Sequence, residues 1–167
     1  MRAGIAFGSN LGDRLDLLRQ ARACVLASPL LAPPFLTSGV YLTSPVNCPP
    51  GSGAFLNAVL EAELKGDPFE FLRHLHACER SLGRSGGSGR NAPRTIDLDL
   101  LYAGQSEIFI EGGLILPHPR ITLRRFVLAP LAEIRPTLRL PRGTETIAEL
   151  LKKLPPGDSA ELFAAAW

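Results

Sequence analysis

The segment 55–64 alternates apolar and mixed residues over ten positions, and it constrains the fold more than any other part of the chain. In an extended strand, successive side chains point to opposite faces. One row is wholly apolar and consists of Leu56, Ala58, Leu60, Ala62 and Leu64. The opposite row begins with Phe55 and Asn57 and ends in two glutamates, so it is partly polar. We therefore expect a strand that turns one face to a core and presents an aromatic ring and an amide on the other.

The residues after this strand predict a helix. Asp67 can cap it, Pro68 suits its first position and Glu70 its third. Gly83 is its natural stop. By similar signals we expect strands at 5–7, 35–42, 95–102, 108–110 and 114–116, helices at 13–27, 122–131 and 146–153, and loops at 43–53 and 81–94. Strands joined partly by tight turns and partly by crossover helices predict an α+β layer with helices on one face of the sheet.

Composition limits the class of protein. A length of 167 residues is enough for one domain with its own core, so we expect a single domain over 1–167. With 46% apolar and 20% charged residues the chain is not of the disordered type, and a net charge of +2 is too small for a nucleic-acid coat or a polybasic membrane binder. No apolar run suits a signal peptide or approaches the ~20 residues of a membrane span. We expect a cytoplasmic protein that binds neither nucleic acid nor membrane.

The three cysteines, Cys24, Cys48 and Cys78, are odd in number and widely spaced, and they contain no C-x-x-C pair. That spacing argues against a complete disulfide framework and gives no recognisable zinc site. We therefore expect reduced thiols, as is usual in a cytosolic protein.

Two acids two residues apart, Asp97 and Asp99, give the strongest local signal of a functional site. In a strand they share one face, with Cα atoms roughly 6.5–7 Å apart. Carboxylates that close repel each other, and a hard cation such as Mg²⁺ bound together with substrate phosphates would offset the repulsion. Alternating acids also occur on solvated sheet faces, so the pair by itself leaves both interpretations open.

An arginine-rich loop precedes the two acids. Its basic residues are Arg80, Arg84, Arg90 and Arg94, with no acid between residues 80 and 94. Arginine forks bind phosphate oxygens bidentately, so loop and acids together could hold a metal–triphosphate complex. A solvated basic loop is the alternative. Neither a P-loop nor a dinucleotide fingerprint follows a strand here, so metal and arginines rather than a glycine cradle would hold a nucleotide.

Aromatic and polar residues elsewhere suit a heterocyclic ligand. Asn57 can both donate and accept, and it lies beside Phe55 on the non-core side of the strand. Phe126 is a second candidate aromatic, although a core phenylalanine on a helix is commoner. His118 is held between two prolines, close to further arginines. The turn at 8–13, with two glycines and a capping aspartate, is explained mainly by chain geometry.

Taken in order, these segments resemble the 6-hydroxymethyl-7,8-dihydropterin pyrophosphokinase family of folate biosynthesis. The motifs are G-S-N-L-G-D-R at 8–14, F-L-N-A-V at 55–59, R-N-A-P-R-T-I-D-L-D-L-L at 90–101, L-P-H-P-R at 116–120 and R-R-F-V-L-x-P-L-x-E-I at 124–134. The resemblance spans essentially the whole chain, and the arginine–aspartate block is its specific part. It implies a ferredoxin-like α/β sandwich of the α+β class, with a mostly antiparallel sheet, usually monomeric. It also implies transfer of pyrophosphate from ATP to the hydroxymethyl group of the reduced pterin, with release of AMP.

The resemblance also assigns site residues. The implied catalytic residues are Arg84, Arg94, Asp97 and Asp99, of which the two aspartates would be ligands of two Mg²⁺ ions. The implied ATP-binding residues are His76, Glu79, Arg84, Arg94, Leu100, His118 and Arg124. The implied pterin-binding residues are Thr43, Ser44, Val46, Phe55, Asn57 and Phe126. The resemblance does not settle which group deprotonates the hydroxyl, and Asp99 is a candidate.

The chain departs from the family pattern in and near the arginine-rich loop. Gly86 stands where the family often has a second arginine, Asn91 and Ala92 replace a bulky aromatic, and His76 replaces a common glutamine. These changes bear on closure of a lid and on rate rather than on the metal pair. Arg90 is a candidate substitute for the missing arginine.

Two rival functions remain at this point. A non-catalytic module could bind RNA or a regulatory nucleotide through the basic loop, but 7% aromatic residues and acids on the binding surface disfavour it. A metal-dependent phosphohydrolase could use the same acids and would release phosphate from ATP without a pterin. AMP release that depends on added pterin separates all three.

Overall fold

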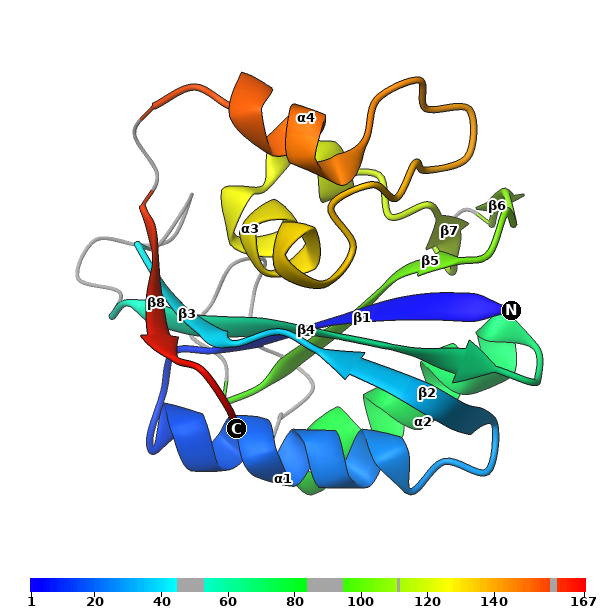
Figure 1. Ribbon diagram of the computed structural model, residues 1–167. Helices are drawn as coiled ribbons and strands as arrows, with labels where there is room; N and C mark the ends of the chain where they lie inside the picture. The colour runs from blue at the N-terminus through cyan, green and yellow to red at the C-terminus, as the bar shows by residue number, and fades with distance from the viewer. Residues whose placement is uncertain (45–52, 84–94, 111, 157–158) are drawn as a thin grey trace.

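Strand β4 (Phe55–Leu64) occupies the centre of an antiparallel sheet in the computed structural model, which describes residues 1–44, 53–83, 95–110, 112–156 and 159–167 (Figure 1). It pairs with β1 (Arg2–Ser9) on one side and with β2 (Leu31–Thr37) and β3 (Val40–Thr43) on the other. At the two ends of the sheet lie β5 (Asp97–Ala103), beside β1, and β8 (Ala160–Ala164), beside β3. The expected α+β sandwich with a mostly antiparallel sheet is confirmed.

Helices cover both faces of this sheet. In Figure 1, α1 (Arg14–Leu26) and α2 (Pro68–Ser81) lie below the sheet, and α3 (Arg125–Ile134) and α4 (Ile147–Lys153) lie above it. Each pair encloses a separate apolar core. The expectation that helices cover one face only is wrong. The physical reason is that the second row of β4 is buried as well, because Val59 packs against α3 and Asn57 and Glu61 have polar partners in the interior.

The connections after β5 are short. A small hairpin of β6 (Ile108–Phe109) and β7 (Ile115–Leu116) is followed by a 3₁₀ turn, η1 (Ile121–Leu123), which leads into α3. The helix expected at 146–153 is α4, and a capping box formed by Thr146 and Glu149 lies at its start. Among the described residues, no helix combines the length and the apolar character that a membrane crossing requires.

Two features of the strands differ from the sequence-based expectation. The strand expected at 35–42 is two strands, with Ser38 and Gly39 between β2 and β3. Strand β8 was not expected, because its five residues are mostly exposed and do not alternate. It is followed by Trp167, whose ring packs edge-on against Phe7 at 5.0 Å and whose Nε1 donates to the carbonyl of Ser38 at 2.8 Å.

The buried carboxylate of Glu61, in the second half of β4, holds several polar groups together in the interior. Its side chain is fully buried, with Arg2 Nη2 2.7 Å and Arg135 Nε 3.5 Å from its oxygens. The hydroxyl of Tyr102 donates to the same carboxylate. Burial and this acidic neighbour raise the pKa of Tyr102, so the phenol stays protonated and keeps donating. Gly4 makes room for the ring, since a Cβ there would lie 2.4 Å from a tyrosine ring carbon.

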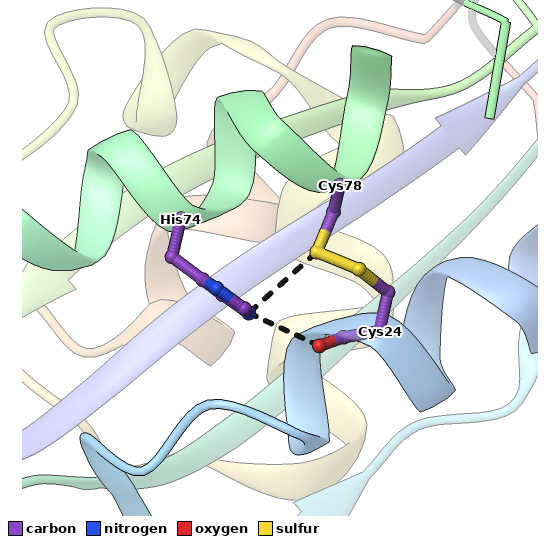
Figure 2. Close-up of side chains that lie close together, drawn as sticks. All are labelled: Cys24, His74 and Cys78. Atoms are coloured by element: carbon purple, nitrogen blue, oxygen red, sulfur yellow. Dashed lines mark hydrogen bonds between the residues drawn. A yellow bond between two sulfur atoms is a disulfide. The ribbon is translucent and has the colours of Figure 1, made fainter. Parts of the chain in front are cut away.

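A disulfide joins Cys24 of α1 to Cys78 of α2, with Cα atoms 5.9 Å apart (Figure 2). The expectation of reduced thiols is therefore wrong for these two residues, and Cys48 lies outside the described residues. The pairing could not be read from spacing, because 54 residues separate the two cysteines along the chain. They meet because both helices pack on the same sheet face.

Candidate active site

Asp97 and Asp99 lie on the face of β5 that looks towards α3. Leu98 and Leu100, the residues between and after them, point the other way into the core shared with α1 and α2. Both aspartates are partly exposed. The register places Asp97 beside Gly8 of β1. The carboxylate pair therefore shares one side of the sheet, as the D-x-D spacing predicted.

Two basic side chains approach Asp99. Arg124 Nη1 lies 3.3 Å from Asp99 Oδ2, and His118 Nε2 lies 3.9 Å from the same oxygen. The backbone nitrogen of His118 donates to the carbonyl of Leu101 at 2.8 Å, which fixes the loop against β5. The Nδ1 atom of His118 accepts from the backbone of Arg120 at 3.1 Å. This bond leaves the proton of the neutral ring on Nε2, the nitrogen that faces the carboxylate.

Burial lowers the pKa of both basic groups. For His118, burial outweighs the attraction of Asp99, which raises the pKa, so the neutral ring is favoured near pH 7. For Arg124, burial likewise lowers the pKa, Asp99 raises it, and the guanidinium stays charged in either case. The guanidinium lies over the ring of Phe126, 5.3 Å from its centroid. A half-buried cation, a neutral imidazole and two carboxylates thus lie together, which suits a phosphate chain carried by a metal ion.

The amide of Asn57 lies in the same row of the sheet as Asp97, with Gly8 between them. Its Nδ2 donates to Thr43 Oγ1 at 2.6 Å, and both side chains are buried. A Cβ on Gly8 would lie 3.1 Å from Asn57 Oδ1, so glycine keeps the space in front of the amide open. Phe55 faces Thr43 across the β3–β4 pair and is half-buried. The row therefore runs from a carboxylate pair to a fixed amide beside an aromatic ring.

Four other predicted residues lie in the described part of the chain. Ser44 follows β3 and is exposed, and His76 is exposed on α2. Glu79 is only 2% exposed, and its Oε1 accepts from the backbone nitrogen of Leu98 at 2.8 Å. The side chain of Leu100 is in the α1–α2 core, so only its backbone could contact a ligand on the other face. Val46, Arg84 and Arg94 were also predicted, and they lie outside the described residues.

Two residues of the 8–14 motif have contacts that sequence reasoning missed. Ser9 Oγ donates to the carbonyl of Thr95 at 2.6 Å, which ties the end of β1 to the chain just before Asp97. Arg14 Nη1 donates to the carbonyl of Ala54 at 2.7 Å, directly before Phe55. The motif therefore positions the two halves of the site. The sequence offered one signal for these contacts, the polar residues of the 8–14 turn. That signal was not specific, because the two glycines already accounted for the turn.

Comparison with known proteins identifies the family. The family model described as 7,8-dihydro-6-hydroxymethylpterin-pyrophosphokinase (HPPK) matches residues 4–136. The chain belongs to this family. A Bacillus subtilis member named 2-amino-4-hydroxy-6-hydroxymethyldihydropteridine pyrophosphokinase is 44% identical over 132 residues, covering 79% of this chain and 77% of the relative. A protein of the same name from Mycobacterium tuberculosis is 38% identical and covers 97% and 89%.

Some relatives of the family are longer. The folate synthesis bifunctional protein of Arabidopsis thaliana is 37% identical over 130 residues, and the match spans 78% of this chain but 26% of the plant protein. The crystal structure of wild-type Plasmodium falciparum HPPK-DHPS has a TM-score of 0.72 at 14% identity, covering 91% of this chain and 44% of that one. At that identity the structural match supports the fold alone.

Proposed function

We propose that this protein transfers the terminal diphosphate of ATP to the hydroxymethyl group of 6-hydroxymethyl-7,8-dihydropterin, giving AMP and the pterin diphosphate for folate biosynthesis. The observation that carries the proposal is the shared row of Asp97, Gly8 and Asn57, with Arg124 and His118 beside Asp99. Family membership and the names of the full-length relatives support the same activity.

The carboxylate pair fits a hard divalent cation. Partly exposed carboxylates on one face offer oxygen donors, which are the ligands that Mg²⁺ prefers. The nearby Nε2 of His118 carries the ring proton and therefore does not compete as a ligand. We expect Asp97 and Asp99 to hold two Mg²⁺ ions with ATP. When bound, such ions neutralise the triphosphate and polarise the phosphoryl group under attack.

Charge at the site is supplied by arginines as well. Arg124 is fixed by Asp99 and by the ring of Phe126, so it needs little reorganisation to meet a developing negative charge. Neutral His118 can donate from Nε2 to an acceptor on the nucleotide side. We expect Arg84 and Arg94 to contact the phosphates too. Asp99 is the candidate to take the proton of the attacking hydroxyl.

The pterin side uses the other end of the row. Because Asn57 Nδ2 is committed to Thr43, the amide carbonyl Oδ1 faces the open space above Gly8 and can accept from a ring N–H. Phe55 and Phe126 are the expected stacking partners, and the chain at 43–46 is expected to add backbone contacts. This arrangement holds the pterin hydroxymethyl group near the carboxylates, where orientation supplies much of the rate gain.

One assay tests the function. The full chain with Mg-ATP should release AMP only when reduced hydroxymethylpterin is added. Inorganic phosphate formed from ATP without pterin would instead indicate a phosphohydrolase. Tight RNA binding that weakens steeply with salt, in the absence of turnover, would indicate a nucleic-acid module. The expected single domain, monomeric state and cytoplasmic location stay predictions, and light scattering during gel filtration tests the oligomeric one.

Phe55→Ala is expected to weaken pterin binding about 10-fold or more while ATP binding changes less than about 2-fold. The reason is that a stacked ring contributes roughly 1–3 kcal/mol to binding a planar heterocycle. Calorimetric titration with each ligand separately measures the two affinities. An equal loss for both ligands would contradict the assigned pocket.

Gly8→Ala is expected to weaken pterin binding with little loss of stability. The backbone of β1 accepts alanine, but the new methyl group would press on Asn57 Oδ1 and turn the amide out of line. Titration with pterin and thermal melting of the same variant separate the two effects. Ala3→Gly, near the other end of β1 and facing the α1–α2 core, is the control and should leave pterin affinity unchanged. Unaltered affinity in Gly8→Ala would show that the amide does not read the ligand.

A further inference from the structure

Three metal-binding side chains meet between α1 and α2, on the sheet face opposite the active site (Figure 2). They are Cys24, His74 and Cys78, and their donor atoms all lie within 4.8 Å of one another. Cys24 and Cys78 are joined as a disulfide, and Nε2 of His74 lies 3.6 Å from Cys78 Sγ. The proposed reaction does not use this cluster.

We propose that the reduced form of this protein binds one zinc ion through Cys24 Sγ, Cys78 Sγ and His74 Nε2. Thiolate sulfur and imidazole nitrogen are the ligands that Zn²⁺ prefers over Mg²⁺. With Zn–S of about 2.3 Å and Zn–N of about 2.05 Å, a tetrahedral site has an N···S edge of about 3.6 Å. The His74–Cys78 separation already equals that edge.

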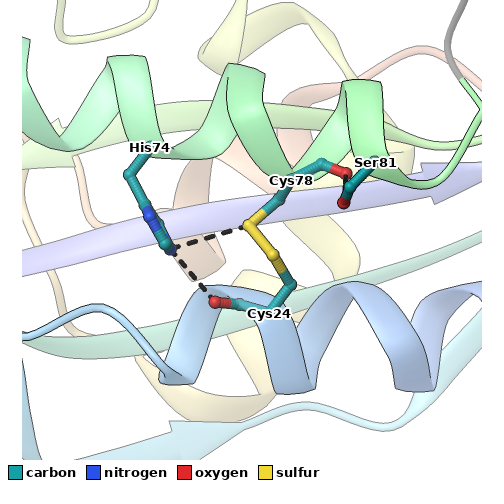
Figure 3. Close-up of a disulfide and its surroundings, with 4 residues drawn as sticks. All are labelled: Cys24, His74, Cys78 and Ser81. Atoms are coloured by element: carbon teal, nitrogen blue, oxygen red, sulfur yellow. Dashed lines mark hydrogen bonds between the residues drawn. A yellow bond between two sulfur atoms is a disulfide. The ribbon is translucent and has the colours of Figure 1, made fainter.

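The helices hold the three donors in place for this role. His74 and Cys78 are four residues apart on α2, so they share one face of the helix. The ring of His74 stacks on Phe71 with centroids 6.2 Å apart and planes 20° apart, which limits its rotation. Ser81 Oγ donates to the carbonyl of Cys78 at 2.8 Å and secures that end of α2 (Figure 3). For tetrahedral zinc the two sulfurs must separate from the disulfide to about 3.8 Å apart.

The solvent exposure of the three side chains also suits binding of a metal ion. Cys78 is buried, whereas Cys24 and His74 are partly exposed, so solvent can reach one side of the cluster. Three protein ligands leave the fourth tetrahedral position for water. An ion can therefore enter from solvent without opening the core.

Metal binding and the disulfide exclude each other, because both use the same sulfur electron pairs. A phosphine reductant breaks the S–S bond and takes oxygen from water to become the phosphine oxide, and the two water protons give two thiols. Zinc binding then forms two Zn–S bonds and one Zn–N bond and releases both thiol protons. His74 Nε2 now donates to the carbonyl of Cys24 at 3.0 Å, so its proton must move to Nδ1 through solvent while the ring stays neutral.

Cobalt titration of the phosphine-reduced full chain tests the site. One Co²⁺ per chain is expected, with intense d–d bands of a tetrahedral ion and a thiolate-to-cobalt charge-transfer band. Zn²⁺ should displace the cobalt with the same stoichiometry. The oxidised chain should show neither the thiolate charge-transfer band nor the tetrahedral d–d bands. Absence of a tetrahedral cobalt spectrum in the reduced chain, or an unchanged spectrum in the oxidised chain, would overturn the proposal.

Single variants identify the ligands. Cys24→Ser, Cys78→Ser and His74→Gln should each weaken zinc binding at least about 100-fold, more than loss of a group outside the coordination sphere costs. The matched control is Cys48→Ser, which should bind zinc as the parent does. Loss of binding in the control, or parental affinity in any of the three variants, would contradict the ligand set.

Because a variant could fail to fold when reduced, thiol protection in the unaltered chain gives a second measurement. Alkylation of the reduced protein followed by mass spectrometry should show that zinc slows modification of Cys24 and Cys78 at least about 10-fold and leaves Cys48 unaffected. Equal modification of all three cysteines with and without zinc would overturn the proposal.

Discussion

Replacing Asp99 by asparagine is expected to lower the rate of AMP formation at least about 1000-fold and to leave the fold intact. The amide keeps the shape of the side chain but removes the charge that would hold a divalent cation and that fixes Arg124 at 3.3 Å. Loss of one preorganised electrostatic group costs about 10²–10³ in rate, and here the metal clamp is weakened as well. Single-turnover assays of AMP release with Mg-ATP and pterin measure the effect. Asp97→Asn should behave similarly.

The matched control is Asp16→Asn, which changes an exposed aspartate in the first turn of α1 that accepts from Gln20. Its rate should equal that of the parent chain. Circular dichroism of all three variants checks that the sheet is retained. An Asp97→Ala/Asp99→Ala double variant that still forms AMP would eliminate the metal-clamp argument altogether.

Replacing Glu61 by alanine is expected to lower the free energy of unfolding by about 3 kcal/mol. Removing one partner of a buried ion pair leaves the others without their counter-charge, which costs roughly 3–5 kcal/mol when the pair is fully buried. Arg2 and Arg135 are partly exposed, so the lower end of that range applies. The hydroxyl of Tyr102 also loses its acceptor in the interior. Urea denaturation at pH 7 measures the change.

Glu63→Ala, two residues along β4, is the control for this prediction. That carboxylate is 46% exposed and lies 3.9 Å from the amino group of Met1, a contact of little energetic weight. Its stability should change by less than about 0.5 kcal/mol. If the two variants had equal stability, the interior network of Glu61 would contribute nothing measurable.

The parts of the fold that follow local rules were predictable from the sequence. The apolar row of β4 faces the α1–α2 core as the alternation at 55–64 indicated. Asp67 as the cap and Pro68 as the first helical residue set the start of α2, and the capping box set the start of α4. The D-x-D spacing placed Asp97 and Asp99 on one face, because strand geometry alone decides that. The roles expected for residues within 45–52 and 84–94 stay predictions, because those segments lie outside the described residues.

The features that were missed depend on contacts between distant segments. The helices on the second sheet face could not be predicted from β4, because its polar members are buried by partners such as Arg135, 74 residues away along the chain. The register of β1 with β5 shifts at Leu101, so that Tyr102 pairs with Gly4. As a result, Leu101 and Tyr102 are adjacent in sequence but both lie in the core beneath α3 and α4. The Cys24–Cys78 contact likewise needs the packing of two helices. Such pairings leave no local pattern.

The alternation of β5 has a consequence for how errors in folding affect activity. Leu98 and Leu100 fill the interior while Asp97 and Asp99 lie on the face towards α3, and the two sets alternate along the strand. Slippage by one residue against β1 would bury both acids and expose both leucines, so hydrophobic packing rejects that misalignment. Packing of the two leucines in the core thus selects the register that places the two carboxylates on the face towards α3. We expect misfolded but compact chains with a displaced acid pair to be rare, and molecules that complete the core to be competent for chemistry.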